Sequence, residues 1–146
     1  MKSIIVFSGS TIGREVVKLI REINFKKRAW EILGIVDDEL YKKGKKRIDD
    51  VKILSSKQIE VNKNLYAICA VGNIVLKKKI LKQIESFKFK LATLIHPSIF
   101  LYEDTKINHG TIIFANAQIG HTVNIEKNVL ISFANDIGHD VKIGKN

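Results

Sequence analysis

The sequence predicts an α/β protein in which a parallel, doubly wound sheet is followed by a β-helix. Over the first two thirds of the chain, short apolar runs alternate with helical patterns, as in parallel sheets with helical crossovers. Thereafter isoleucine falls on every sixth residue, which fits neither the period of a helix nor that of a flat strand. A period of six indicates a chain that winds around one axis in stacked coils. These isoleucines are Ile107, Ile113, Ile119, Ile125, Ile131, Ile137 and Ile143.

The elements of the predicted sheet follow from these apolar runs. A small-residue turn at 8–13 separates the first strand from a helix whose apolar face begins at Val16 and Val17. The polar, lysine-rich segment 39–50 is expected to be a loop, and Ser55-Ser56 could cap a brief helix after a short strand at Ile53-Leu54. We expect the main strands at residues 4–7, 30–36, 65–71 and 91–95, and a second long helix at 74–87.

Three clusters lie where these strands end, and ligands of such sheets bind at the carboxyl ends of the strands. Glycines in the first turn would let the backbone approach a phosphate at a helix N-terminus. Carboxylates after the second strand suit sugar hydroxyls or a base N–H. A lone small-residue turn is equally compatible with a structural role, because it lacks the full dinucleotide-binding pattern. The clusters are Gly9 to Gly13, Asp37-Asp38 and Gly72-Asn73.

Two of the four histidines recur in the repeat with the same neighbours. His121 and His139 are 18 residues apart, and three hexapeptides make one coil, so both should lie on one face. A histidine can act as a general base near neutral pH, and the adjacent Asp140 could orient it. A plain surface histidine is the alternative. We expect no metal, because the chain offers no third ligand at a suitable spacing.

The net charge of +10 comes mostly from lysine runs. It indicates a solvated surface or attraction for an anionic small ligand, and no recognised nucleic-acid module accompanies it. The only cysteine, Cys69, lies in an apolar run and is expected to be a buried thiol. The apolar start of the chain is too short for a signal peptide or a membrane span, so we expect a cytoplasmic protein. Because no nucleic-acid module accompanies the charge, we expect no nucleic-acid partner.

Several stretches together resemble one family. The chain is similar to the sugar O- or N-acyltransferases of the sialic-acid O-acetyltransferase and PglD type, within the hexapeptide-repeat acyltransferases. The stretches that carry the resemblance are G-R-E-V-V at 13–17, I-V-D-D at 35–38, V-G-N at 71–73, T-L-I-H-P-S at 93–98 and I-G-H-D-V-K-I-G at 137–144.

This resemblance implies a Rossmann-like domain at residues 1–96 that binds a nucleotide sugar, and the first coils of a left-handed parallel β-helix at 97–146. His139 would be the general base, Asp140 would orient it, and acetyl-CoA would be the acyl donor. Family members are usually trimers with acetyl-CoA between neighbouring β-helices, so the resemblance implies a homotrimer. The residues that would line the nucleotide-sugar pocket are Gly9, Gly13, Asp37, Asp38, Gly72 and Asn73.

Members of this family continue for several further coils beyond the catalytic histidine. This sequence ends seven residues after His139, so we expect a C-terminally truncated chain. The resemblance therefore implies an acetyl-CoA-dependent acetyltransferase acting on an amino or hydroxyl group of a free or nucleotide-linked sugar in cell-surface glycan biosynthesis. The alternative is a truncated, non-catalytic remnant that still binds a nucleotide sugar.

Overall fold

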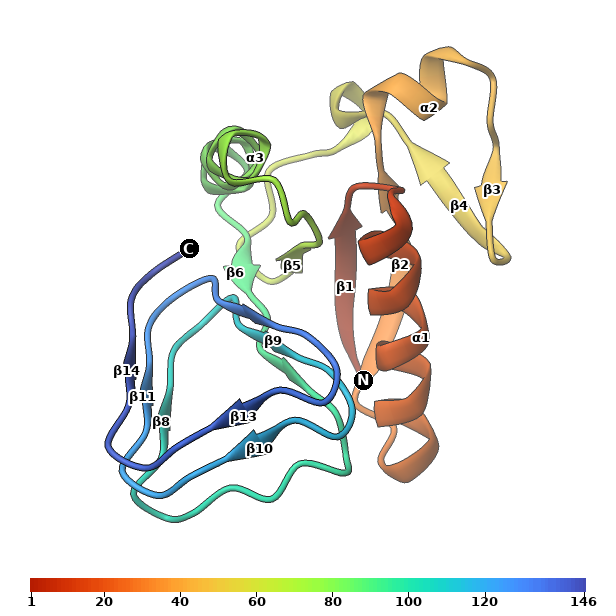
Figure 1. Ribbon diagram of the computed structural model, residues 1–146. Helices are drawn as coiled ribbons and strands as arrows, with labels where there is room; N and C mark the ends of the chain where they lie inside the picture. The colour runs from red at the N-terminus through yellow and green to blue at the C-terminus, as the bar shows by residue number, and fades with distance from the viewer.

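The computed structural model describes residues 1–146, and it places a six-stranded sheet beside a stack of triangular coils (Figure 1). The strand order of the sheet is β3-β4-β2-β1-β5-β6, and every pair is parallel except β3 with β4. The strands are β1 (Lys2–Phe7), β2 (Trp30–Val36), β3 (Arg47–Ile48), β4 (Val51–Leu54), β5 (Tyr66–Cys69) and β6 (Lys90–Leu91).

Helices cover both faces of this sheet, as the sequence predicts. Strand β1 is buried on both sides and alternates its side chains between two cores. Ile4 and Val6 join the cluster beneath helix α1 (Thr11–Lys26), while Ile5 and Phe7 join the cluster beneath helix α3 (Ile74–Ser86). The doubly wound sheet is thereby confirmed.

Two expectations about local structure were wrong. The segment 39–50 is not simply a loop, because Asp37 caps a short helix α2 (Asp38–Lys42) and buried Ile48 brings β3 onto the sheet. The expected strand at 91–95 is two strands. Ala92 still donates to Ala67 of the sheet, whereas β7 (Leu94–Ile95) pairs with the coils. The brief helix after the strand at residues 53–54 is present as η1 (Ser56–Gln58).

The coils are built from two-residue strands that recur every six residues. They stack in parallel on three faces, in the orders β7-β9-β12, β8-β11-β14 and β10-β13. Each strand pairs with the one 18 residues further on, so that Ile107, Ile125 and Ile143 form one interior column. The strands are β8 (Lys106–Ile107), β9 (Ile112–Ile113), β10 (Gln118–Ile119), β11 (Asn124–Ile125), β12 (Leu130–Ile131), β13 (Asp136–Ile137) and β14 (Lys142–Ile143).

The corners of the coils also repeat every six residues. From Gly110 onward, one residue at each corner adopts a positive φ, between 50° and 80°. Glycine, asparagine and aspartate tolerate this left-handed conformation, but a β-branched residue does so at a cost. Thr122 is the only β-branched residue among the seven. They are Gly110, Asn116, Thr122, Asn128, Ala134, Asp140 and Asn146.

One hydrophobic cluster joins the sheet to the first coil. Val16 and Ile20 of α1 share it with Leu94 and Ile112 of the coils. At the rim, His96 lies 3.2 Å from Glu22 of α1. The two parts therefore share packed side chains. None of the helices has both the length and the apolar character needed to cross a bilayer.

The close stacking of coils gives a prediction at Gly120. A Cβ atom there would lie 2.6 Å from the His139 nitrogen and 2.8 Å from the Gly138 carbonyl carbon, both of which are backbone atoms. We expect Gly120→Ala to destabilise the fold by about 1–3 kcal/mol in chemical denaturation, because the coils must move apart. Gly138 occupies the equivalent slot one coil later, where an added Cβ atom would meet no atom within 4 Å. Gly138→Ala is the matched control, and equal losses in the two variants would contradict the prediction.

Candidate functional site

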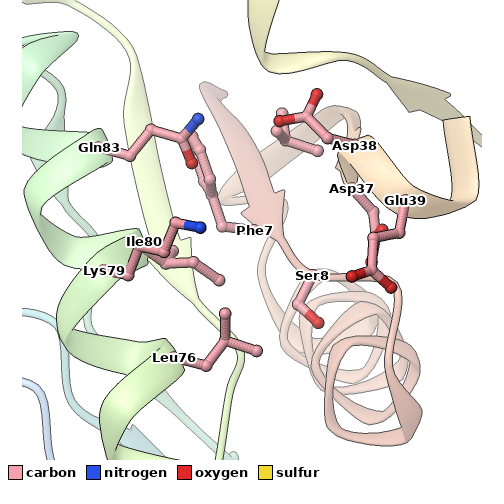
Figure 2. Close-up of a pocket in the computed structure, with 10 residues that line it drawn as sticks. Phe7, Ser8, Asp37, Asp38, Glu39, Leu76, Lys79, Ile80 and Gln83 are labelled. Atoms are coloured by element: carbon pink, nitrogen blue, oxygen red, sulfur yellow. The ribbon is translucent and has the colours of Figure 1, made fainter. Parts of the chain in front are cut away.

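The first candidate site is a cavity of about 240 Å³ at the carboxyl ends of β1 and β2. Figure 2 shows acidic side chains of the β2–α2 junction on one side and side chains of α3 on the other. The lining thus combines three carboxylates, one ammonium, one amide, one hydroxyl and apolar groups. Its residues are Phe7, Ser8, Val36, Asp37, Asp38, Glu39, Leu76, Lys79, Ile80 and Gln83.

The glycines of the first turn support the backbone beside this cavity. A Cβ on Gly13 would lie 2.0 Å from the Ser8 carbonyl oxygen, so only glycine lets α1 begin so close to β1. A Cβ on Gly9 would lie 2.6 Å from Leu40 of α2. Ser10 caps α1 by accepting from the Gly13 N–H at 3.4 Å. The two glycines are absent from the cavity wall, and their part in ligand binding stays a prediction.

Asp37 lines the cavity but has both carboxylate oxygens engaged by the backbone. One oxygen accepts from the Gly9 N–H at 2.9 Å, and the other accepts from the Leu40 N–H at 3.0 Å. Asp37 therefore caps α2 and at the same time ties the glycine turn to it. This double role gives the aspartate a structural function whether or not it also meets a ligand.

Asp38 anchors the start of η1. Its carboxylate accepts from the Ser55 hydroxyl at 2.8 Å, the Ser56 N–H at 2.8 Å and the Ser56 hydroxyl at 2.6 Å. Burial alone would raise the pKa of Asp38, but the hydrogen bonds from Ser56 and Ser55, together with the charge of Lys42, hold it below its ordinary value. Asp38 thus presents a fixed negative charge to the cavity.

The third predicted cluster is also structural in this chain. Asn73 caps α3 by accepting from the Leu76 N–H at 3.0 Å, and a Cβ on Gly72 would lie 2.9 Å from Ile12. Neither residue lines the cavity, whose far wall is formed by α3 one turn further on. Sequence reasoning missed Lys79 and Gln83. Their signal was the helical spacing that places both on one side of α3.

The second candidate site is a ladder of aromatic and imidazole rings on the coils. The rings of His121 and His139 stack with centroids 5.1 Å apart and planes 5° from parallel. The ring of Tyr102 meets the ring of His121 edge to face, with centroids 6.1 Å apart. The 18-residue spacing in the sequence had predicted that the two histidines share a face, and the pairing of β10 with β13 places them there.

The side chains of His139 and Asp140 lie at the surface, close enough to form an ion pair. The Nδ1 atom of His139 lies 2.7 Å from Asp140 Oδ2, and the two side chains are 69% and 66% exposed. Hydrogen bonds from Thr122 and from His139 hold the pKa of Asp140 below its ordinary value. With Nδ1 turned to a carboxylate, the Nε2 atom of His139 is left free, as a general base requires.

A groove of about 360 Å³ lies beside this ladder. Phe100 and Tyr102 line it, and the two rings meet edge to face at 5.0 Å. Sequence reasoning missed this groove because its aromatic residues fall outside the isoleucine register. The other lining residues are Ser98, Asn116, Ala117, Gln118 and Ile119.

The remaining candidate groups lie away from both sites. His109 lines a different cavity with Tyr66 and Lys127. Cys69 is buried, so the expectation of a buried thiol is confirmed, and this burial raises the pKa of the thiol to about 11. No three side chains of the His, Cys, Asp or Glu type come together as a metal site would require.

Comparison with known families identifies the N-terminal part. Residues 3–84 match the model described as the PglD N-terminal domain. The chain belongs to the PglD N-terminal domain family. The resemblance to PglD-type acyltransferases that the motifs predict is therefore confirmed.

Solved structures extend the likeness of this PglD-type chain to its coils. The acetyltransferase domain of PglB from Neisseria gonorrhoeae, in complex with acetyl coenzyme A, matches 97% of this chain and 66% of its own, with a TM-score of 0.80 at 19% identity. PerB from Caulobacter crescentus, with CoA and GDP-perosamine, matches 96% of this chain and 64% of its own, with a TM-score of 0.78 at 16% identity. These likenesses confirm a parallel-sheet domain joined to a left-handed β-helix. The chain spans about two thirds of the length of these solved chains.

The anchoring of Asp38 gives a prediction about pH. The depressed pKa means that its stabilising effect is present above the pKa of an unfolded aspartate, about 3.8, and is lost as the pH falls further. We expect Asp38→Asn to cost about 1 kcal/mol near neutrality. The difference from the unmodified chain should shrink below about pH 4, measured by urea denaturation across that range. The exposed Asp104→Asn is the control, and a difference for Asp38→Asn that stays constant down to pH 2 would contradict the prediction.

Proposed function

We propose that this chain contains the nucleotide-sugar-binding domain and the general base of a sugar acetyltransferase. The enzyme would transfer an acetyl group from acetyl-CoA to an amino or hydroxyl group of a nucleotide-linked sugar, in the biosynthesis of cell-surface glycans. Residues 1–96 would bind the nucleotide sugar and residues 97–146 would supply the base. The observation that carries the proposal is the exposed His139, paired through Nδ1 with Asp140, in a chain of the PglD family.

His139 would act at the step where the sugar attacks the thioester. The sugar nitrogen or oxygen forms a bond to the carbonyl carbon, and Nε2 of His139 takes the proton that this nucleophile loses. The carbon–sulfur bond then breaks, and the imidazolium returns the proton to the departing thiolate of coenzyme A. Asp140 stabilises the imidazolium because its carboxylate remains charged beside Nδ1.

The cavity at the sheet edge is the proposed nucleotide-sugar site. Leu76 and Ile80 offer an apolar surface for the face of a base, and Lys79 offers a cation for a phosphate. Glu39 is exposed and its carboxylate has no hydrogen-bond partner in the protein, so this carboxylate can accept from sugar hydroxyls or a base N–H. The complex of PerB with GDP-perosamine supports a ligand of this class.

The groove beside the histidine ladder is the proposed approach for the acyl donor. Phe100 is 71% exposed and offers apolar contact close to the imidazoles. The complex of the PglB acetyltransferase domain with acetyl coenzyme A supports this donor. We further propose that three copies assemble, with the donor held between neighbouring β-helices.

A turnover assay tests the base. The complete native polypeptide would be given acetyl-CoA and UDP- or GDP-linked amino sugars, and release of coenzyme A would be followed. We expect His139→Ala to lower kcat by about 100-fold or more, because the general base is lost. His109→Ala is the control on the same coils. Undiminished turnover in His139→Ala would reject the base, and sugar binding without any turnover in the unmodified protein would favour the non-catalytic alternative.

A binding measurement tests the cavity separately. We expect Lys79→Ala to weaken the affinity for the nucleotide sugar about tenfold in calorimetry, because one charge-assisted contact to a phosphate is removed. Lys78→Ala removes the same charge from an exposed neighbour outside the cavity, and its affinity should be unchanged. Equal effects of the two substitutions would mean that general charge attracts the ligand and that the cavity does not hold its phosphate.

A further inference from the structure

We infer that Thr122 is a positioning residue for His139, because its hydroxyl holds the Asp140 carboxylate from the neighbouring coil and thereby fixes the tautomer of the imidazole. The consequence for catalysis rests on the proposed function, in which His139 is the base. The contacts themselves do not depend on that proposal.

The Asp140 carboxylate is held from two sides. Its Oδ2 atom receives a hydrogen bond from Nδ1 of His139 at 2.7 Å, and its Oδ1 atom receives one from the Thr122 hydroxyl. Thr122 and Asp140 occupy equivalent corners 18 residues apart, so one bond comes from each coil. A carboxylate that is 66% exposed would otherwise rotate freely in solvent.

The orientation of Asp140 matters because a neutral imidazole has two tautomers. A base that acts through Nε2 must carry its proton on Nδ1. The carboxylate favours this tautomer only while it faces Nδ1. His139 is 69% exposed and its ring makes no other hydrogen bond, so Asp140 is the only hydrogen-bonding partner that sets its tautomer, while stacking on His121 holds the plane of the ring.

The backbone of Thr122 is the second observation. Its φ is +57°, at a corner where the six equivalent residues are glycine, asparagine, alanine or aspartate. Threonine is β-branched and strained in this conformation, and its side chain is exposed, so packing does not explain it. Local strain of this kind points to a functional constraint. The hydrogen bond that this strained residue makes across to the next coil is the one to Asp140.

His121 completes the arrangement. Its Nδ1 atom lies 3.2 Å from the Thr122 hydroxyl, which is also 2.7 Å from the His121 carbonyl oxygen. The hydroxyl has one proton, and the charged carboxylate is the stronger acceptor. The hydroxyl oxygen can then accept from Nδ1 of His121. In both stacked rings Nδ1 would then carry the proton and Nε2 would be free. The Nδ1 atom of His121 is hydrogen-bonded to the Thr122 hydroxyl, that hydroxyl to the Asp140 carboxylate, and the carboxylate to Nδ1 of His139.

The test is the tautomer of His139, measured by ¹⁵N NMR on the substrate-free chain at a pH where the ring is neutral. We expect the Nδ1–H form to dominate in the unmodified chain and to fall about threefold or more in Thr122→Val, which keeps the shape and removes the hydroxyl. Thr122→Ser should restore it. Thr105→Val is the matched control, because the Thr105 hydroxyl has no partner and valine fills the equivalent slots at Val123 and Val141. If Thr122→Val does not fold, Thr122→Ala removes the hydroxyl without the β-branch.

An unchanged tautomer in the folded valine or alanine variant would overturn the inference, as would failure of serine to restore it. This outcome is independent of turnover, because no substrate is present. If the tautomer shifts as expected but the unmodified native protein shows no acetyl transfer, the inference about Thr122 stands and the proposed function fails. In an active protein, Thr122→Val should lower kcat about tenfold with little change in KM, and serine should restore it.

Discussion

The stacking of one coil on the next, in register and through backbone hydrogen bonds, is the constraint on which the rest of this structure depends. The His121 carbonyl accepts from Asp140, and the Ile137 carbonyl accepts from Gly120, so residues 18 positions apart lie at strand spacing. This spacing is close to the distance at which flat rings stack. The imidazole pair and the contact between Thr122 and Asp140 are therefore consequences of the coil repeat, and the side chains need only small adjustments to meet.

The sheet depends on a second constraint, which is the close approach of α1 to the end of β1. Gly13 allows that approach, and the apolar face of α1 then packs on both the sheet and the first coil. A single hydrophobic cluster thus connects the proposed nucleotide-sugar cavity to the coils that carry His139. Packed cores transmit position well, because their side chains leave little free volume.

The elements with a strong period were predictable from the sequence, and those fixed by tertiary contacts were not. The isoleucine register predicted the coils and the stacking of His121 on His139, because a period of 18 is a geometric statement. Helix α2 was missed because its signal is a single capping aspartate in a lysine-rich segment. The α3 wall of the cavity was missed because the sequence of a helix does not show which of its residues will line a cavity at the edge of the sheet. Thr122 was missed because its corner conformation appears only once the coils are built.

The left-handed corners also decide which changes of length the coils can absorb. Every corner and every interior isoleucine recurs at the same interval, so one residue added within a strand would shift the phase of all that follow. Later isoleucines would turn toward solvent, and the two histidines would lose their common face. Extra residues can be added without this loss only where the backbone already turns, as a loop that projects from a corner such as Asn116 or Ala134. The coils therefore accept variation in side chains, or whole loops at their corners, but not single insertions along their faces.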